Sequence, residues 1–114
     1  MDIELTQDAE YLLCELYRAY VTSRKNGEPA EISRAFGSSE RIQKDCIQDW
    51  PTHDIDYAAH ALCEEGMLEA IFEADELVES FLTNRGIAYM EHRFGRKLDT
   101  LLQRLATLRT VLLG

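Results

Sequence analysis

The chain has 114 residues, 46% of them hydrophobic and 29% charged, so it is long enough for one hydrophobic core and its composition excludes general disorder. The acidic start Met1–Glu4 is unlike a secretory signal, and no apolar run approaches the roughly 18 residues of a membrane span. The net charge is −9, with −13 on residues 1–82 and +4 on residues 83–114. We therefore expect a cytoplasmic protein without a membrane partner, with an acidic body and a basic C-terminal segment.

Four segments in the first part of the chain have apolar residues at the three- and four-residue spacing of amphipathic helices. Thr6 is a favoured N-cap for the first, Pro29 is a favoured first-turn residue for the second, and Gly66 is suited to end the fourth. The predicted helices cover residues 6–25, 29–36, 39–48 and 54–65.

A different pattern follows between residues 67 and 82. Leu68, Ala70 and Phe72 alternate with acidic residues, and a second apolar run follows a turn near Ala74. Alternation of this kind predicts a β-hairpin over 67–82. After it, Thr83 caps a predicted helix that continues over 83–114 in the same domain.

The expected architecture is therefore mainly helical with one small hairpin, an α+β fold. The run Leu62–Glu69 resembles the junction between the third helix and the wing of bacterial winged-helix proteins, and Leu82–Met90 looks like the step from the wing to the final helix. The chain is similar to small bacterial proteins of the YjcQ type and, more distantly, to PadR-like regulators. This resemblance covers roughly residues 6–92. One departure is that residues 38–51 replace a tight turn, and the role of this insertion is left open.

The resemblance implies a transcription-regulator-like protein whose 54–65 helix enters the major groove of DNA. The exposed face of that helix is expected to consist of His53, Asp56, Tyr57, His60, Ala61 and Glu64. None of these is Arg, Lys, Asn or Gln, the residue types that make bidentate contacts to guanine and adenine. The helix and hairpin together give a candidate acidic interaction face: Asp56, Glu64, Glu69, Glu73, Asp75 and Glu76. DNA reading by this helix and wing is therefore disfavoured.

Two basic segments keep DNA binding open as a hypothesis. The candidate contacts are Arg41 and Lys44 in the 39–48 helix and Arg93, Arg96, Lys97 and Arg104 in the C-terminal helix. Acidic neighbours offset the charge of the first segment. The second would form a paired basic ridge in a dimer.

A homodimer is expected because the C-terminal helix has a heptad stripe of apolar residues. The stripe, and hence the candidate dimer interface, is Ile87, Phe94, Leu98, Leu101, Leu105, Leu108 and Leu112. A helix of about 30 residues is roughly 45 Å long, more than a domain of this size can cover alone. Its basic flanks, Lys97, Arg104 and Arg109, would repel each other in a parallel pair. An antiparallel pair, or packing of each flank on the acidic body of the partner, would relieve this, and the direction is left open.

No residue pattern predicts catalysis, a metal site or a cofactor. His53, His60, Cys63 and Glu64 are the nearest approach to a zinc-ligand set, but Cys63 lies on the apolar stripe and no CxxC or HExxH spacing occurs. Three cysteines without a short-spaced pair are typical of buried thiols in a reducing compartment. We therefore expect a protein that is not an enzyme.

Two functions remain open at this point. One is a dimeric, transcription-regulator-like protein that contacts DNA through a non-standard basic surface. The other is an acidic protein–protein interaction module, including one that mimics DNA, whose partner is a basic protein. The sequence identifies neither a DNA site nor a partner nor a small-molecule ligand.

Overall fold

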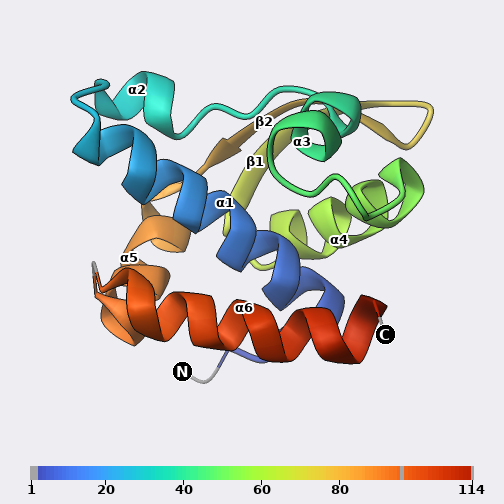
Figure 1. The fold of residues 1–114 in the computed structure, drawn as a ribbon. Coiled ribbons are helices and arrows are strands. Elements are labelled where there is room, and N and C mark those ends of the chain that lie inside the picture. Colours follow the sequence, from blue (N-terminus) through green and yellow to red (C-terminus); the bar gives the residue numbers. More distant parts are fainter. Residues whose placement is uncertain (1–2, 96, 114) are drawn as a thin grey trace.

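The computed structural model describes residues 3–95 and 97–113 (Figure 1). It is mainly helical with a small antiparallel hairpin, which confirms the α+β class. The elements are α1 (Gln7–Lys25), α2 (Ala30–Ser33), α3 (Ser39–Asp45), α4 (Thr52–Glu64), β1 (Leu68–Glu73), β2 (Glu76–Leu82), α5 (Asn84–Phe94) and α6 (Leu98–Leu113). One continuous cluster of buried apolar side chains joins all of these elements except α2.

Helix α1 crosses the middle of the molecule and packs against α2, α4, α5 and α6 (Figure 1). The predicted cap is confirmed, because the Ala9 N–H donates to Thr6 Oγ1 at 3.2 Å. Every residue from 9 to 17 is buried, including the carboxylates Glu10 and Glu15. A helix surrounded on most sides buries residues outside its apolar stripe, and charged ones among them need partners.

The hairpin pairs Leu68 with Leu82 at its open end and Glu73 with Glu76 at its turn. The segment beside the hairpin differs from the helix predicted there. Of the predicted 29–36 helix only Ala30–Ser33 is helical, because residues 34–36 pair with the outer edge of β2. The Phe36 N–H donates to the Ser80 carbonyl at 2.9 Å, and the Leu82 N–H donates to the Arg34 carbonyl at 2.9 Å.

Two other helix boundaries differ from the expected ones. Helix α3 ends at Asp45 rather than at residue 48, and the following loop turns Ile47 and Trp50 into the core. Helix α4 begins at Thr52, two residues before the predicted start, with Pro51 at its N-cap position. Its end is as expected, with Gly66 in the left-handed region at φ +73°.

The prediction of one helix over 83–114 is wrong. Helix α5 ends at Gly95, whose backbone has φ +62° and ψ −147°. After this break in the helix, α6 turns back along α1 (Figure 1). The Tyr17 hydroxyl donates to the Gly95 carbonyl at 2.7 Å and holds this break against α1. At the other end of α5, Thr83 is the expected cap, and a Cβ at Gly86 would lie 2.4 Å from the Met67 carbonyl oxygen.

This break changes the meaning of the heptad stripe. Its members Ile87, Phe94, Leu101, Leu105 and Leu108 are buried within the chain, and Leu98 and Leu112 are half-buried against the same cluster. The stripe therefore packs on its own domain, and the described part of the chain has two shorter helices, α5 and α6, in place of one helix of about 45 Å. Self-association stays a prediction, but the stripe is no longer a reason to expect a homodimer.

Candidate interaction site

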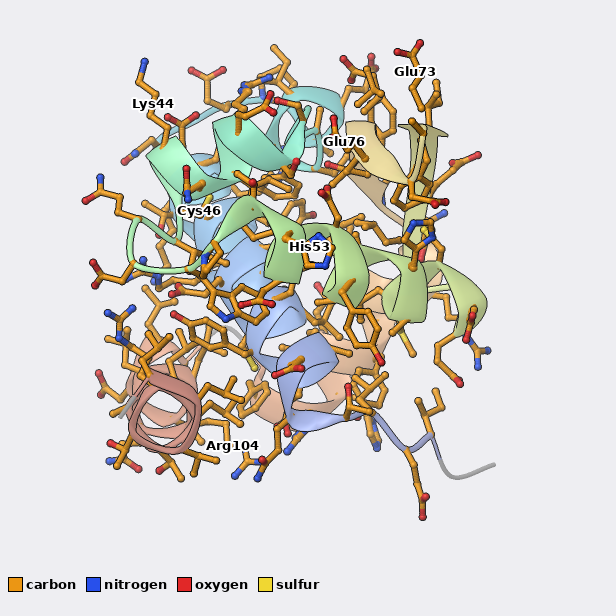
Figure 2. The ribbon with its side chains drawn as sticks, turned by 90° about the vertical axis from the view of Figure 1, so that its right-hand side faces the viewer. Lys44, Cys46, His53, Glu73, Glu76 and Arg104 are labelled. Carbon is orange, nitrogen blue, oxygen red and sulfur yellow. The ribbon has the colours of Figure 1, made fainter. Side chains whose placement is uncertain are left out.

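Helix α4 and the hairpin turn enclose a groove with a volume of about 840 Å³. Its walls include Tyr57, His60 and Glu64 from α4 and residues 74–76 from the turn. Figure 2 looks onto this side of the molecule, with His53 on α4 toward the viewer and Glu76 above it. Among the residues that the structure describes, no Lys or Arg lines the groove, and the sequence has none between Asp45 and Asn84.

The groove gathers four of the six predicted acidic residues, namely Asp56, Glu64, Asp75 and Glu76. Glu69 and Glu73 are exposed on β1 but lie outside the groove. The placement of Asp56 corrects the sequence analysis, which put it on the exposed face of its helix. Its side chain is 8% exposed, because the hairpin folds back onto that flank of α4.

Asp56 fastens the hairpin to α4. The Leu77 N–H donates to Asp56 Oδ1 at 2.9 Å, which satisfies a buried backbone donor just past the turn. His60 adds a second tie, because its ring stacks on Phe72 with centroids 3.8 Å apart and planes 11° apart. Two contacts, one from Asp56 and one from His60, therefore hold the hairpin against α4 along the groove.

Tyr57 differs from these anchored neighbours. It lines the groove and is 67% exposed, the largest exposure among the big apolar and aromatic side chains that the structure describes. An aromatic ring this accessible beside several carboxylates can stack on a flat cationic group.

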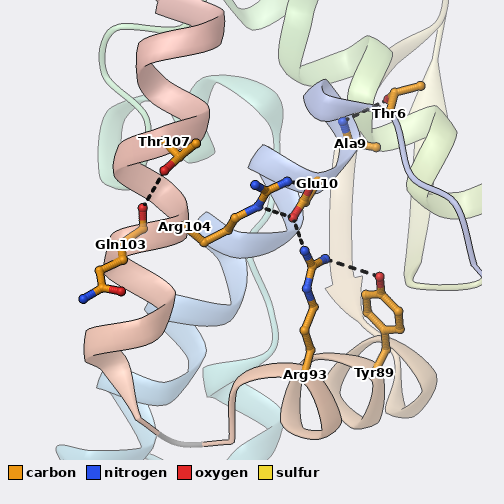
Figure 3. Close-up of polar contacts among 8 residues, drawn as sticks. All are labelled: Thr6, Ala9, Glu10, Tyr89, Arg93, Gln103, Arg104 and Thr107. Carbon is orange, nitrogen blue, oxygen red and sulfur yellow. Dashed lines mark hydrogen bonds and ion pairs between the residues drawn. The ribbon is translucent and has the colours of Figure 1, made fainter.

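Three arginines of the C-terminal helices, Arg93, Arg104 and Arg109, pair instead with carboxylates of the domain body. Glu10 of α1 lies between two arginines (Figure 3). Arg104 donates from Nε and Nη2 to the two Glu10 oxygens at 2.7 and 2.6 Å, and Arg93 Nη2 lies 2.7 Å from Glu10 Oε2. Burial pushes the pKa of Glu10 upward, but the two arginines outweigh it and hold the pKa below its ordinary value.

A second cluster lies further along α1 and α6. Arg109 lies 3.2 Å from Asp49 Oδ2 and donates to the Tyr11 hydroxyl at 3.0 Å, and the same hydroxyl donates to Glu15 at 3.2 Å. Burial raises the pKa of Glu15 above its ordinary value, against the pull of Arg18, Tyr11 and Arg109. Arginines of α5 and α6 thus neutralise carboxylates of the domain body.

Arg41 and Lys44, the candidate DNA contacts on α3, lie away from Arg104. Arg41 lies 3.6 Å from Asp45 in an exposed pair on α3. Lys44 and Arg104 are on different sides in Figure 2, the first at the top and the second at the bottom. Lys97 is exposed and directly precedes α6. Arg96 lies outside the described residues.

The cysteines are poor nucleophiles. Burial raises the pKa of Cys14 to about 12 and that of Cys46 to about 11, and it also raises the pKa of Cys63. Across the described part of the chain, no three His, Cys, Asp or Glu side chains converge as metal ligands would. Within residues 3–95 and 97–113, no helix combines the length and the apolar character that crossing a bilayer requires.

Comparison with protein-family models, with characterised proteins and with solved structures finds no match to this chain.

Proposed function

We propose that this chain is a protein-interaction module on a winged-helix frame, that it is not an enzyme, and that its acidic α4–hairpin face binds a basic partner protein. The element order supports the frame. Helix α1, the paired segment 34–36, α3, α4 and the hairpin follow one another as in a winged helix. Under this assignment α3 and α4 are the two helices of the motif, and residues 46–51 are its turn rather than part of an insertion.

The single observation that carries the proposal is the internal pairing of the C-terminal arginines. Arg93 and Arg104 are held by Glu10, and Arg109 is held by Asp49 and Tyr11. Their charge therefore offsets buried and neighbouring carboxylates and does not offset the groove. A surface of unpaired carboxylates repels phosphates and attracts cationic side chains, which favours a basic protein over DNA.

The alternative, a DNA-binding regulator with a basic ridge, is the weaker proposal. Two of the arginines assigned to that ridge would have to leave a carboxylate that is 6% exposed in order to contact phosphate. Leaving a buried carboxylate without partners is costly. Cytoplasmic location and a homodimer remain predictions.

Fluorescence anisotropy at low salt separates the two. A labelled oligolysine peptide is titrated with the protein, and a labelled duplex of mixed sequence is titrated in parallel. We expect saturable, salt-sensitive binding of the peptide and none of the duplex. Retention of the duplex without peptide binding would overturn the proposal.

A charge-matched pair of variants locates the face. Glu64→Gln with Glu76→Gln removes two groove carboxylates and is expected to weaken peptide binding about tenfold. Glu28→Gln with Glu31→Gln changes the net charge equally on exposed residues in α2 and in the loop before it, on another side of the molecule (Figure 1). This control is expected to weaken binding less than twofold. Equal weakening by both pairs would show that only net charge matters.

A further inference from the structure

The groove contains a buried carboxylate with an unused acceptor. Asp56 is 8% exposed, and its Oδ1 is occupied by the Leu77 N–H. No partner for its Oδ2 occurs among residues 3–95 and 97–113, although the side chain lines the groove. A carboxylate held rigidly by one oxygen and open at the other is a preorganised acceptor for a donor that enters the groove.

The ring of Tyr57 lies one residue further along α4 and is 67% exposed. It shares the groove with Asp56. A tyrosine face attracts cations, and it suits a planar guanidinium better than a compact ammonium because the two planes can stack.

Three exposed carboxylates complete the wall: Glu64 on α4, and Asp75 and Glu76 at the hairpin turn. The other ionisable groups of the groove are His53 and His60. One of these, His60, is held by the stack on Phe72, with its Nε2 3.3 Å from the Asp75 carbonyl oxygen. The groove therefore offers acceptors and a π face to a cation, and none of the described residues that line it is a Lys or Arg that would oppose one.

We propose that this groove binds an arginine side chain of the partner protein, with the guanidinium stacked on Tyr57 and its N–H groups donating to Asp56 Oδ2 and to the wall carboxylates. The inference rests on the proposed function and specifies its partner. A volume of about 840 Å³ is larger than one side chain, so it also admits the peptide backbone on either side of the arginine. A lysine at the same position would gain the charge attraction but neither the stacking nor the forked hydrogen bonding.

The test compares two labelled peptides of equal charge and length, nona-arginine and nona-lysine, in anisotropy titrations at about 0.15 M salt, where simple charge attraction is screened. We expect nona-arginine to bind about tenfold more tightly. Tyr57→Ala is expected to remove most of this difference and to leave nona-lysine binding within twofold. Phe81→Ala, which truncates a 36% exposed aromatic side chain outside the groove, is the matched control and should change neither affinity.

Asp56→Asn tests the buried acceptor without removing the structural hydrogen bond. The amide oxygen still accepts from the Leu77 N–H, so the fold is retained, which a thermal melt of the variant checks. Nona-arginine binding should weaken at least fivefold. An arginine preference that survives both Tyr57→Ala and Asp56→Asn would overturn the site.

The failures are distinguishable. If both peptides bind equally and Tyr57→Ala has no effect, the arginine inference is wrong while the acidic interaction face stands. If neither peptide binds, at low salt or at about 0.15 M, the proposed function fails with it.

Discussion

The α6 side and the α4–hairpin side of the molecule treat charge in opposite ways. On the first, Arg93 and Arg104 pair with the Glu10 carboxylate of α1. Arg109 contacts the Tyr11 hydroxyl of α1 and the Asp49 carboxylate of the loop after α3. On the second, Glu64, Asp75 and Glu76 are exposed around a groove that no Lys or Arg of residues 3–95 and 97–113 lines. Charge that is paired within a chain stabilises its tertiary structure, whereas unpaired charge around a groove is available to a partner.

The largest expected effect tests whether the α6 side is internal structure. Leu105→Ala should lower the free energy of unfolding by about 2–5 kcal/mol, because Leu105 is 3% exposed and its loss leaves a cavity between α6 and α1. Leu102→Ala, on the same helix but 44% exposed, should cost less than about 0.5 kcal/mol. Denaturant unfolding followed by circular dichroism measures both.

The same experiment distinguishes an internal stripe from a dimer interface. Packing within one chain makes the loss at Leu105 independent of protein concentration, whereas a subunit interface makes stability rise with concentration. A midpoint for the wild type that shifts with concentration, and no longer shifts in Leu105→Ala, would restore the dimer stripe.

The next effect concerns the paired charges. Glu10→Gln should cost about 1–3 kcal/mol, since it leaves Arg93 and Arg104 with a neutral partner in a half-buried place. Glu4→Gln, at an exposed position, is the control and should be close to neutral. Stability curves in urea at neutral pH give the comparison.

The pH dependence of that loss has a definite sign. The pKa of Glu10 lies below its ordinary value of 4.5 in the folded chain, so its ionised form stabilises the fold. That contribution is complete well above pH 4.5 and is lost as the pH falls through the lower, folded pKa. The stability difference between wild type and Glu10→Gln should therefore be constant near neutral pH and close in acid. A gap that widens in acid would contradict the pairing.

On the groove side, Asp56 should behave as a structural residue as well as an acceptor. Asp56→Ala should cost about 1–3 kcal/mol because the Leu77 N–H loses its partner, while Asp56→Asn should cost less than about 1 kcal/mol. Thermal unfolding of the two variants measures the difference. Equal losses would mean that the charge, not the hydrogen bond, holds the hairpin.

The smallest effect is at the hairpin turn, which supports the groove. Ala74 has φ +49° and Asp75 φ +67°, a two-residue turn that suits hairpin twist but strains a residue with a Cβ. Ala74→Gly should therefore stabilise the protein by about 0.5–1 kcal/mol. The same exchange at Ala88, an exposed helical position, should destabilise it by a similar amount. Opposite shifts of the melting temperature are the expected result.

Local features of the fold were predictable from the sequence. The caps at Thr6 and Thr83, the end of α4 at Gly66 and the hairpin follow from short-range backbone chemistry. The break at Gly95 was missed because Phe94 and Leu98 keep the heptad spacing across it. A periodic pattern does not reveal a reversal of the chain, although a glycine inside an expected helix is the signal that marks this one.

The site was harder to predict because its contacts join distant segments. The acidic composition of the groove was visible, but the burial of Asp56 depends on where the hairpin folds. The pairing of Glu10 with Arg104 joins residues 94 positions apart. One signal was available: Glu10 precedes Cys14 and Tyr17 by four and seven residues, so a carboxylate occupies the buried side of α1 and requires a cationic partner.

Glu10 and Arg104 are 94 positions apart along the chain, and this separation determines when their ion pair can form during synthesis. During synthesis α1 is made well before α6, the helix that covers its charged side. Until α6 emerges from the ribosome, the leucines and the carboxylate of α1 that are buried in the folded protein lack their final partners. The core can therefore close only after α6 has been synthesised, and the nascent chain must stay soluble until then.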